Sequence, residues 1–417
     1  MTFASVRLFR CWSGALLSFA AAVASPGTPV DPALVPATVN VAPGPQYGDA
    51  TRPFQGIPGL ARAPGGRLWA TWYGGGDDEG PENYVMLATS ADDGVTWSSV
   101  SAVVDPAGPV RAYDPVLWVD PAGRLWWFYA QSYKWWDGRA GVWATTTANA
   151  DDAKPTWSEP RRLADGIMMN KPTACVNGDW LFPVAMWQEE PKTGVAPGDR
   201  KVVPPAHNHW RREAVGTHVY VSTDQGQTVT LRGTARFPDL QFDEHSILER
   251  QDRSLWLWAR TRTGIGESFS SDGGATWTPG REAKIPHVNA RFFVRRLRSG
   301  NLLLVKHNPT LDVAWLASGS VKGAAQRRSH LTAYLSKDDG RSWTGGLLLD
   351  ERIAVSYPDG DEADDGRIFI VYDFNRKTDR EILLAVFTEA DVLAGRLVDT
   401  RSRLRGLINR ATGPAAP

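Results

Sequence analysis

The stretches SADDGVTW at residues 90–97, SSDGGATW at 270–277 and SKDDGRSW at 336–343 repeat one pattern, Ser-x-Asp-x-Gly-x-Thr/Ser-Trp. A fourth copy, STDQGQTV at 222–229, lacks only the Trp, and a degenerate copy, ANADDAKPTW, ends at residue 157. A turn motif that recurs along a chain indicates a repeated supersecondary unit, and such repeats decide the architecture before any other signal.

Each copy has the chemistry of a tight turn. The Asp carboxylate can accept backbone N–H hydrogen bonds, and Gly adopts positive φ without steric cost. The Trp offers a large apolar anchor, which we expect to pack under the next unit. Strand-like runs such as YVMLATS and HLTAYLS precede the copies. We therefore interpret the unit as a β-hairpin whose Asp side chains hold the turn and do not take part in catalysis.

A second phrase, a Gly turn followed by an apolar strand, alternates with the first, as in PGGRLWATW, PAGRLWWFY and ADDGRIFIV. Together the phrases give about six four-stranded units, and the 19 Trp and 40 Gly suit many short strands joined by turns. The predicted fold class is all-β, a six-bladed β-propeller. Only EADVLAGRL, near Glu389, is typical of a short helix.

The N-terminus has the features of an export signal. Arg7 and Arg10 precede the apolar run GALLSFAAAVA, which ends in an Ala-x-Ala cleavage pattern at Ala22 to Ala24. We expect residues 1–24 to be a signal peptide, 25–45 a Pro/Gly-rich lead-in, 46–400 the propeller and 401–417 a C-terminal tail. The tail is expected to begin as a peripheral strand or helix. The protein would then be periplasmic or secreted.

Composition narrows the possible partners. The 46 Lys and Arg balance the 46 Asp and Glu, so the formal net charge is zero and nothing indicates a nucleic-acid partner. After the N-terminal run no stretch is long and apolar enough to span a membrane. Cleavage would remove Cys11 and leave only Cys175, which excludes an internal disulfide and suggests a buried small side chain. We expect a monomer.

A long polar, Pro-rich insertion between residues 188 and 215 contains His207 and His209. Two His separated by one residue, without a nearby carboxylate–His or Cys pattern, are weak evidence for a metal. We therefore expect neither a metal nor another cofactor, and interpret this segment as a loop beside the site.

Through its Asp boxes the chain resembles the sialidase (neuraminidase) superfamily, also called Asp-box or BNR-repeat proteins, over nearly all of its mature length. The resemblance implies a six-bladed sialidase-fold propeller with its active site at one end of the central axis. Non-enzymatic propellers also carry Asp boxes, so function has to be argued from the site.

The resemblance also implies the catalytic groups. Sialidases use a Tyr nucleophile, and a phenol with a pKa near 10 needs a neighbouring carboxylate as base. Tyr357 in AVSYPDG and Glu244 in FDEHSILER stand in the family's order and are the predicted nucleophile and base. For the general acid, the loop GGGDDEGPEN offers an acidic trio, in which Asp78 is favoured and Asp77 comes next.

Arginines are expected to bind the substrate carboxylate, because their planar forks match its geometry. Arg260 and Arg328 match two members of the family's arginine triad. At the third position, ahead of Ile57-Pro58, this chain has Gly56, and Arg52 lies four residues upstream as a possible replacement. Four further polar residues beside strand-like runs are either ligand contacts or structural ion pairs; they are Arg291, Arg376, Asp373 and Asp114.

These residues favour an exported exo-glycosidase of the sialidase type that removes a terminal, acidic sugar from a glycan by a retaining mechanism. Two alternatives stay open. One is a relative with altered chemistry, either a glycosidase for another sugar or a uronate-type polysaccharide lyase, which Gly56 favours. The other is a non-catalytic carbohydrate-binding propeller, which the combination of Glu244 and Tyr357 opposes.

Overall fold

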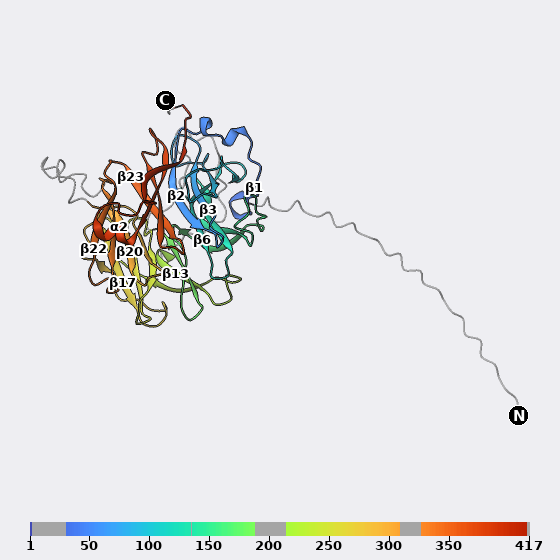
Figure 1. Cartoon of the computed structure of the whole chain (residues 1–417). Coiled ribbons are helices and arrows are strands. Elements are labelled where there is room, and N and C mark those ends of the chain that lie inside the picture. Colours follow the sequence, from blue (N-terminus) through green and yellow to red (C-terminus); the bar gives the residue numbers. More distant parts are fainter. Residues whose placement is uncertain (2–30, 135, 188–213, 309–326, 415–417) are drawn as a thin grey trace.

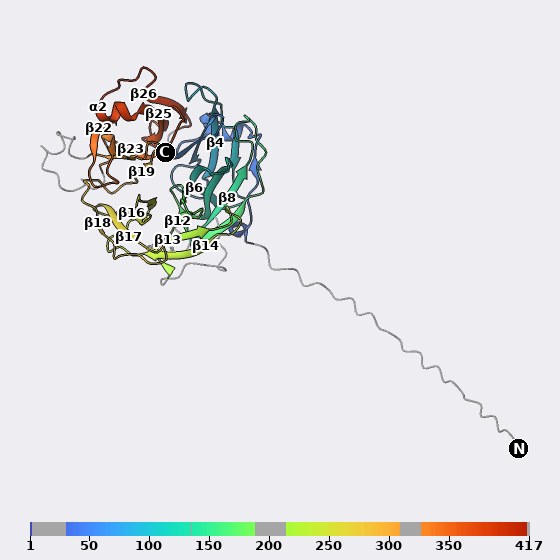
Figure 2. The ribbon, with the colours of Figure 1, turned by 60° about the horizontal axis from the view of Figure 1, so that its bottom comes forward.

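The structure is a computed structural model that describes Met1 and residues 31–134, 136–187, 214–308 and 327–414. Six antiparallel sheets surround a central axis, each built from strands that are consecutive in the sequence. In Figure 2 the chain colours pass around the ring from blue through green and yellow to red. The predicted six-bladed propeller is confirmed (Figure 1).

The first three sheets follow each other along the chain. The first contains β1 (Val39–Asn40), β2 (Gln55–Arg62), β3 (Leu68–Gly74), β4 (Tyr84–Ser90) and β5 (Ala102–Val104). The second contains β6 (Val110–Val119), β7 (Leu125–Tyr133), β8 (Gly141–Thr147) and β9 (Arg161–Asp165). The third contains β10 (Ile167–Met168), β11 (Thr173–Ala174), β12 (Trp180–Met186), β13 (Gly216–Ser222) and β14 (Thr230–Ala235).

The other three sheets complete the ring. The fourth contains β15 (Ser246–Glu249), β16 (Leu255–Thr261), β17 (Gly264–Ser270) and β18 (Arg281–Glu282). The fifth contains β19 (Phe293–Arg296), β20 (Leu302–His307), β21 (Leu331–Ser336) and β22 (Thr344–Asp350). The sixth contains β23 (Val355–Glu362), β24 (Arg367–Phe374), β25 (Glu381–Thr388) and β26 (Arg403–Arg410).

Short helices lie outside the sheets. Three 3-10 turns precede β2, namely η1 (Pro32–Leu34), η2 (Pro45–Tyr47) and η3 (Asp49–Thr51), and α2 (Glu389–Ala394) follows β25 where a short helix was expected. Because β26 pairs with β25, the last sheet extends beyond residue 400, where the sequence had placed the end of the propeller. In the described part of the chain, no helix is long and apolar enough to cross a bilayer.

The Asp boxes are turns held by their own side chains. In the first copy Ser90 Oγ donates to Asp92 Oδ1 at 2.7 Å, and Asp92 accepts from the backbone N–H and the hydroxyl of Thr96 at 2.9 and 2.6 Å. These hydrogen bonds hold the pKa of Asp92 at about 2, against the opposing effect of desolvation. The copies at Asp224, Asp272 and Asp338 repeat the pattern, so the structural interpretation is confirmed.

The Trp of each box packs on the sheet before its own, not on the next one as expected. Trp97 joins a cluster shared by the first and sixth sheets, and Trp277 one shared by the third and fourth. Trp343 of the fifth sheet lies 5.9 Å from Trp258 of the fourth, measured between ring centroids. The turn follows the third strand of a sheet and lies next to the preceding sheet. There the Trp packs between the two sheets.

No strand is shared between the two ends of the described chain, so side chains close the ring together with backbone bonds from Gln55 N–H to Arg376 O at 3.2 Å and from Thr412 N–H to Asp49 O at 2.8 Å. Asp359 Oδ2 on β23 accepts the backbone N–H of Leu60 on β2 at 2.8 Å. Arg52, fully buried, donates to Asn409 Oδ1 on β26 at 2.9 Å and to Gln55 Oε1 at 3.1 Å. These bonds tie the first sheet to the last.

Three innermost strands share a bulge that prepares the site. β2, β6 and β23 each shift register at a residue that precedes a proline. These residues, Ile57, Asp114 and Tyr357, have φ values of 57°, 49° and 56°. Residues other than glycine rarely adopt this left-handed backbone conformation, because it costs about 1–3 kcal/mol per residue. Such strained residues are concentrated at functional sites. The bulges of β2 and β23 lie near the starts of their strands, toward the end of the axis opposite the Asp boxes, and the bulge of β6 lies midway along its strand.

Candidate active site

A pocket of about 620 Å³ opens at this end of the axis. Its walls come from the turn before β15, the ends of β16 and β24, the start of β23 and the loop after β3. The polar residues among those that line it are Asp78, Glu79, Gln241, Arg260, Asn289, Arg328, Ser356, Asn375, Arg376 and Lys377. Cations therefore predominate around a pocket that two carboxylates border.

Tyr357 lies beneath these cations and contacts Glu244. Its hydroxyl donates to Glu244 Oε1 at 3.1 Å, and the two side chains are only 6% and 3% exposed. Within the described residues Glu244 Oε2 accepts no hydrogen bond. The carboxylate therefore keeps capacity to accept a proton, which is the geometry that a phenol and its base require.

Glu244 is presented by a strained turn. Phe242, Asp243 and Glu244 have successive φ values of 60°, 55° and 40°. Three non-glycine residues in the left-handed region are costly and persist only when their surroundings impose them. Asn170 helps to do so, because its side-chain amide donates to the Glu244 and His245 carbonyls at 2.7 and 3.0 Å.

The pKa of Tyr357 is raised, first by burial and then by the charge of Glu244. Arg328, Arg260 and Arg376 oppose this shift without cancelling it. The free protein thus holds a protonated phenol that is hydrogen-bonded to a carboxylate. Transfer of the proton to Glu244 would generate the nucleophile when it is needed.

The two predicted triad arginines line the pocket, but only Arg260 is paired with a carboxylate among the described residues. Arg260 Nη1 donates to Glu244 Oε1 at 2.7 Å and its Nε to Asn289 Oδ1 at 2.7 Å. Arg328 lies over the Tyr357 ring, 5.2 Å from its centroid, and has no ion pair among the described residues. Burial lowers the pKa of Arg328, as expected for a cation without a counter-charge. An anionic ligand would stabilise it.

Arg376 also lines the pocket, 5.0 Å from the Tyr357 ring centroid. Its Nη1 donates to Glu79 Oε1 at 3.0 Å, and its Nε lies 3.6 Å from Asp373 Oδ2. Asp373 does not line the pocket. It is fully buried and accepts from the Ile57 N–H and the Ser356 hydroxyl at 2.8 and 2.7 Å. Asp373 therefore has a supporting position, which is the structural one of the two roles that the sequence left open.

The acidic loop is arranged differently from the expectation. Asp78 lies at the rim with a 59% exposed side chain and accepts from Lys377 at 2.5 Å. Partial burial acts to raise the pKa of Asp78, but the bond from Lys377 outweighs it and the net pKa is lowered. Asp77 does not line the pocket, whereas Glu79 does and is 27% exposed. Of the trio, Glu79 lies nearest to the nucleophile's cations.

Three other predicted ligands do not line this pocket. Arg52 donates hydrogen bonds to Gln55, Tyr47, Asp49 and Asn409. It therefore does not replace the arginine that is absent at position 56. Arg291, 1% exposed, donates to Asn170 Oδ1 at 2.9 Å and lies 3.5 Å from Asp359 Oδ1. Asp114 is buried, and burial followed by the charge of Glu79 raises its pKa to about 8.

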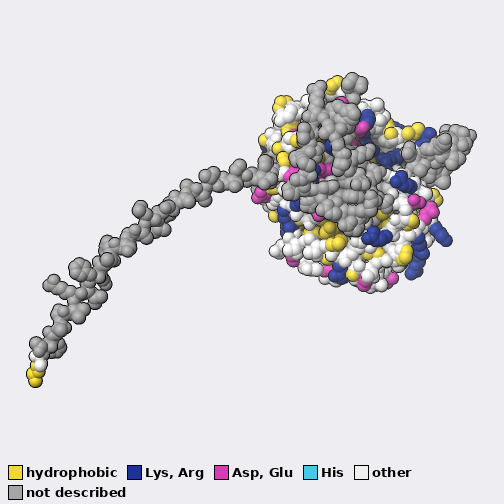
Figure 3. All heavy atoms as spheres, turned by 180° about the vertical axis from the view of Figure 1, so that it is seen from behind, with side chains coloured by type: hydrophobic (Ala, Val, Ile, Leu, Met, Phe, Trp, Pro, Cys, Tyr) yellow, Lys and Arg dark blue, Asp and Glu magenta, His cyan; other side chains and the backbone are white. Residues whose placement is uncertain are grey.

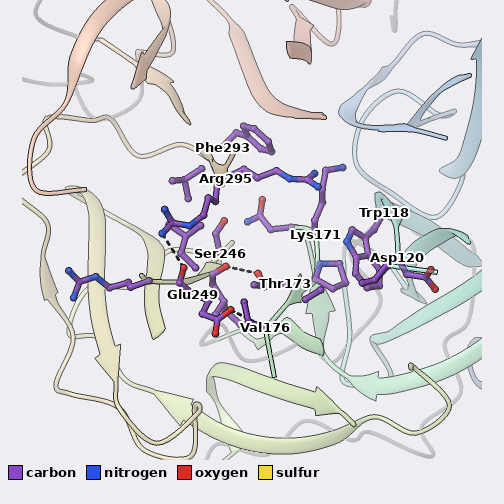
Figure 4. A pocket seen from close by; sticks show the side chains of 18 of the residues that line it. Trp118, Asp120, Lys171, Thr173, Val176, Ser246, Glu249, Phe293 and Arg295 are labelled. Atoms are coloured by element: carbon purple, nitrogen blue, oxygen red, sulfur yellow. Dashed lines mark hydrogen bonds between the residues drawn. The ribbon is translucent and has the colours of Figure 1, made fainter. Parts of the chain in front are cut away.

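A second pocket of about 590 Å³ opens at the Asp-box end (Figure 4). Lys171 points into the channel there and donates to the Leu60 and Leu117 carbonyls and to Asp359 Oδ2 at 2.5, 2.6 and 2.8 Å. This cluster binds three innermost strands together. Asp359 follows Tyr357 by two residues on β23, so the cluster lies close to the candidate site, and its bonds to the chain give it a structural role.

Sequence reasoning overlooked several pocket residues. Lys377 follows Arg376 in the turn after β24, and Phe242 precedes the predicted base by two positions. Charged residues that follow a strand indicate a loop that could border a site. Only the fold shows that the turn after β24 lies against the loop after β3. Among the described residues no cluster of His, Cys, Asp or Glu could hold a metal. His207 and His209 lie outside those residues.

The face shown in Figure 3 carries basic and acidic side chains interspersed where it is described, in keeping with the balanced charge. Cys175 is a half-buried free thiol packed beside the core between the third and fourth sheets, and burial raises its pKa to about 12. Neither feature adds to the chemistry of the site.

The architecture defines a propeller of the sialidase type. Residues 66–370 match the model of the BNR repeat-like domain, so the chain belongs to this family within the sialidase superfamily. The Hadza microbial sialidase Hz136 is 17% identical with a TM-score of 0.59, over 81% of this chain and 66% of that one.

Two further solved structures match nearly the whole of their own chains. A protein of unknown function from Dyadobacter fermentans is 15% identical over 82% of this chain and 95% of its own, with a TM-score of 0.58. The intramolecular trans-sialidase from Ruminococcus gnavus is 14% identical over 82% and 95%, with a TM-score of 0.55. No curated protein matches. Identities this low establish a common fold and leave the chemistry to the site.

Proposed function

We propose that the protein is a retaining exo-glycosidase that hydrolyses a terminal acidic sugar from a glycan, with Tyr357 as nucleophile and Glu244 as its base. The observation that carries the proposal is the 3.1 Å hydrogen bond between these two buried side chains beneath Arg260 and Arg328. Structural roles alone do not require a strained Tyr, a strained Glu and a cation without a counter-charge in one pocket.

In the first step, the Tyr357 oxygen attacks the anomeric carbon while its proton passes to Glu244 Oε1. A carboxylic acid of the loop after β3 protonates the leaving oxygen, and we assign this role to Glu79. In the second step the Glu79 carboxylate takes a proton from water, the water oxygen replaces Tyr357 on the sugar, and Glu244 returns its proton to the phenol. Two displacements at the anomeric carbon give net retention.

An acidic sugar fits because Arg328 has no counter-charge among the described residues and Arg260 lies beside it in the pocket. A neutral nucleophile also suits an anionic substrate, since a carboxylate in its place would repel the sugar's own carboxylate. The similar proteins named as sialidases point in the same direction. The predicted N-terminal signal supports action outside the cytoplasm.

The glycine at position 56 favours a second candidate, a glycosidase of the same mechanism for a sugar acid other than sialic acid. A panel of aryl glycosides of sialic acid, uronic acids and neutral sugars separates the two, with Tyr357→Phe measured alongside. Release of the aryl group only from sugar acids, abolished in Tyr357→Phe, supports the proposal. Release by Tyr357→Phe at the rate of the unsubstituted protein would refute it.

A further inference from the structure

The space in front of Gly56 is occupied by Arg376. A Cβ atom placed on Gly56 would lie 2.1 Å from Arg376 Cδ, 2.4 Å from its Cγ and 2.9 Å from Asp373 Oδ2. No side chain fits at such distances. Residue 56 therefore has to be glycine as long as the Arg376 side chain passes in front of it. The absence of an arginine on β2 and the presence of Arg376 after β24 thus depend on each other.

We propose that Arg376 supplies the third cation of the carboxylate-binding site, delivered from the sixth sheet in place of the first. The inference rests on the proposed function and extends it to how the sugar acid is recognised. The guanidinium reaches the same pocket as Arg260 and Arg328, and it lies over the ring of Tyr357 together with Arg328.

The support beneath Arg376 is built for this position. Asp373 Oδ2 both accepts the Ile57 N–H at 2.8 Å and lies 3.6 Å from Arg376 Nε. Asp373 Oδ1 accepts the Ser356 hydroxyl, next to the nucleophile, at 2.7 Å. One buried carboxylate thus fixes the bulge of β2, the start of β23 and the direction of the arginine. This leaves the outer edge of the guanidinium facing the pocket and Glu79.

The pairing with Glu79 gives this cation a different behaviour from Arg328. A substrate carboxylate has to share Arg376 with Glu79, whose bond is 3.0 Å long and partly exposed to solvent. Arg328 has no such competitor among the described residues. The hydrogen bond between Arg376 and Glu79 therefore couples recognition of the substrate carboxylate to the residue that we assign as general acid.

The test compares Arg376→Gln, the exchange Gly56→Arg with Arg376→Gly, and the exposed control Arg396→Gln. Each is assayed on an aryl sugar-acid glycoside and on the same glycoside with its carboxylate reduced to a hydroxymethyl group. We expect Arg376→Gln to lower kcat/KM about 100-fold on the acid and less than about 3-fold on the neutral analogue. The exchange should restore at least part of the lost activity on the acid, because it returns an arginine to β2 and removes the clash.

Equal losses on both substrates for Arg376→Gln, or no loss on the acid, would overturn the inference. Binding of the free sugar acid, measured by calorimetry on Tyr357→Phe with and without Arg376→Gln, keeps this result separate from the proposed function. If the wild type hydrolyses nothing but binding still depends on Arg376, the hydrolytic mechanism fails and the inference stands. If the sugar acid does not bind, both fail.

Discussion

The hydroxyl of Tyr357 donates a 3.1 Å hydrogen bond to Oε1 of Glu244, across a separation of 113 residues in sequence. Tyr357 comes from the innermost strand of the sixth sheet and Glu244 from the turn before the innermost strand of the fourth. Both have positive φ. The propeller thus brings two strained, buried groups together from sheets that are not neighbours, and arranges cations above them.

Removal of the phenol oxygen should abolish the proposed covalent route. Tyr357→Phe is expected to lower kcat on the order of 10³-fold on aryl sugar acids, with little change in binding of the free sugar acid. Glu244→Gln should lower kcat by a similar factor, and the two effects should not add, because each variant disables the same pair. Additive losses in the double variant would show that the residues act independently.

The general acid can be identified by comparing substrates whose leaving groups differ in their need for a proton. Glu79→Gln should reduce kcat/KM at least about 100-fold on an alkyl glycoside but under about 10-fold on an activated aryl glycoside, which leaves without a proton. Asp78→Asn and Asp77→Asn are the matched controls and should affect both substrates little. A loss in Asp78→Asn that depends on the leaving group would instead support the residue that the sequence favoured.

Asp114 should make stability fall as pH rises. Its pKa in the folded protein is about 8, mainly because of burial, against about 3.9 in an unfolded chain. Between these values the unfolded chain has released a proton that the folded protein retains, so this group lowers the free energy of unfolding by up to about 1.4 kcal/mol per pH unit. Above pH 8 the effect levels off.

Asp114→Asn mimics the neutral carboxyl and should remove this dependence. In urea unfolding, the variant should gain stability relative to the wild type by at least about 1 kcal/mol between pH 5 and pH 8. The exposed control Asp152→Asn should show a constant difference over the same range. A difference for Asp114→Asn that does not change with pH would mean that the carboxyl is ionised in the folded protein.

Arg52 should be required for stability and not for turnover. Arg52→Met removes four hydrogen bonds of a buried side chain, to Tyr47 O, Asp49 Oδ1, Gln55 Oε1 and Asn409 Oδ1, which we expect to cost about 2–4 kcal/mol in the free energy of unfolding. Arg396→Met, at an exposed position, should cost less than about 0.5 kcal/mol. The activity per folded molecule should match the wild type in both. A selective loss of activity in Arg52→Met would return this residue to the site.

The sequence predicted the propeller because its turn chemistry is local: Ser, Asp, Gly and Thr of one box bond to each other within eight residues. It also grouped Tyr357, Glu244, Arg260 and Arg328 by resemblance, and in the structure both arginines line one pocket, Arg260 bonds Glu244, and Glu244 accepts from Tyr357. Their catalytic roles stay predictions.

What the sequence could not show depends on contacts between distant elements. Arg52 and Arg291 look like ligands in isolation, but their partners Asn409 and Asp359 come from the last sheet of the ring. Gly56 looked like a lost arginine until Arg376, 320 positions later in the numbering, was found across it. The preference for Asp78, with Asp77 next, could not take the Lys377 bond into account, because only the closed ring places the turn after β24 against the loop after β3.

Covalent trapping tests the central claim most directly. The protein is incubated with a fluorinated sugar-acid fluoride, whose second step is slow, then digested and mapped by mass spectrometry. The account predicts one added glycosyl unit on the peptide that contains Tyr357, and none in Tyr357→Phe. An adduct on another residue, turnover with inversion of the anomeric centre, or no reaction with any sugar acid would contradict it.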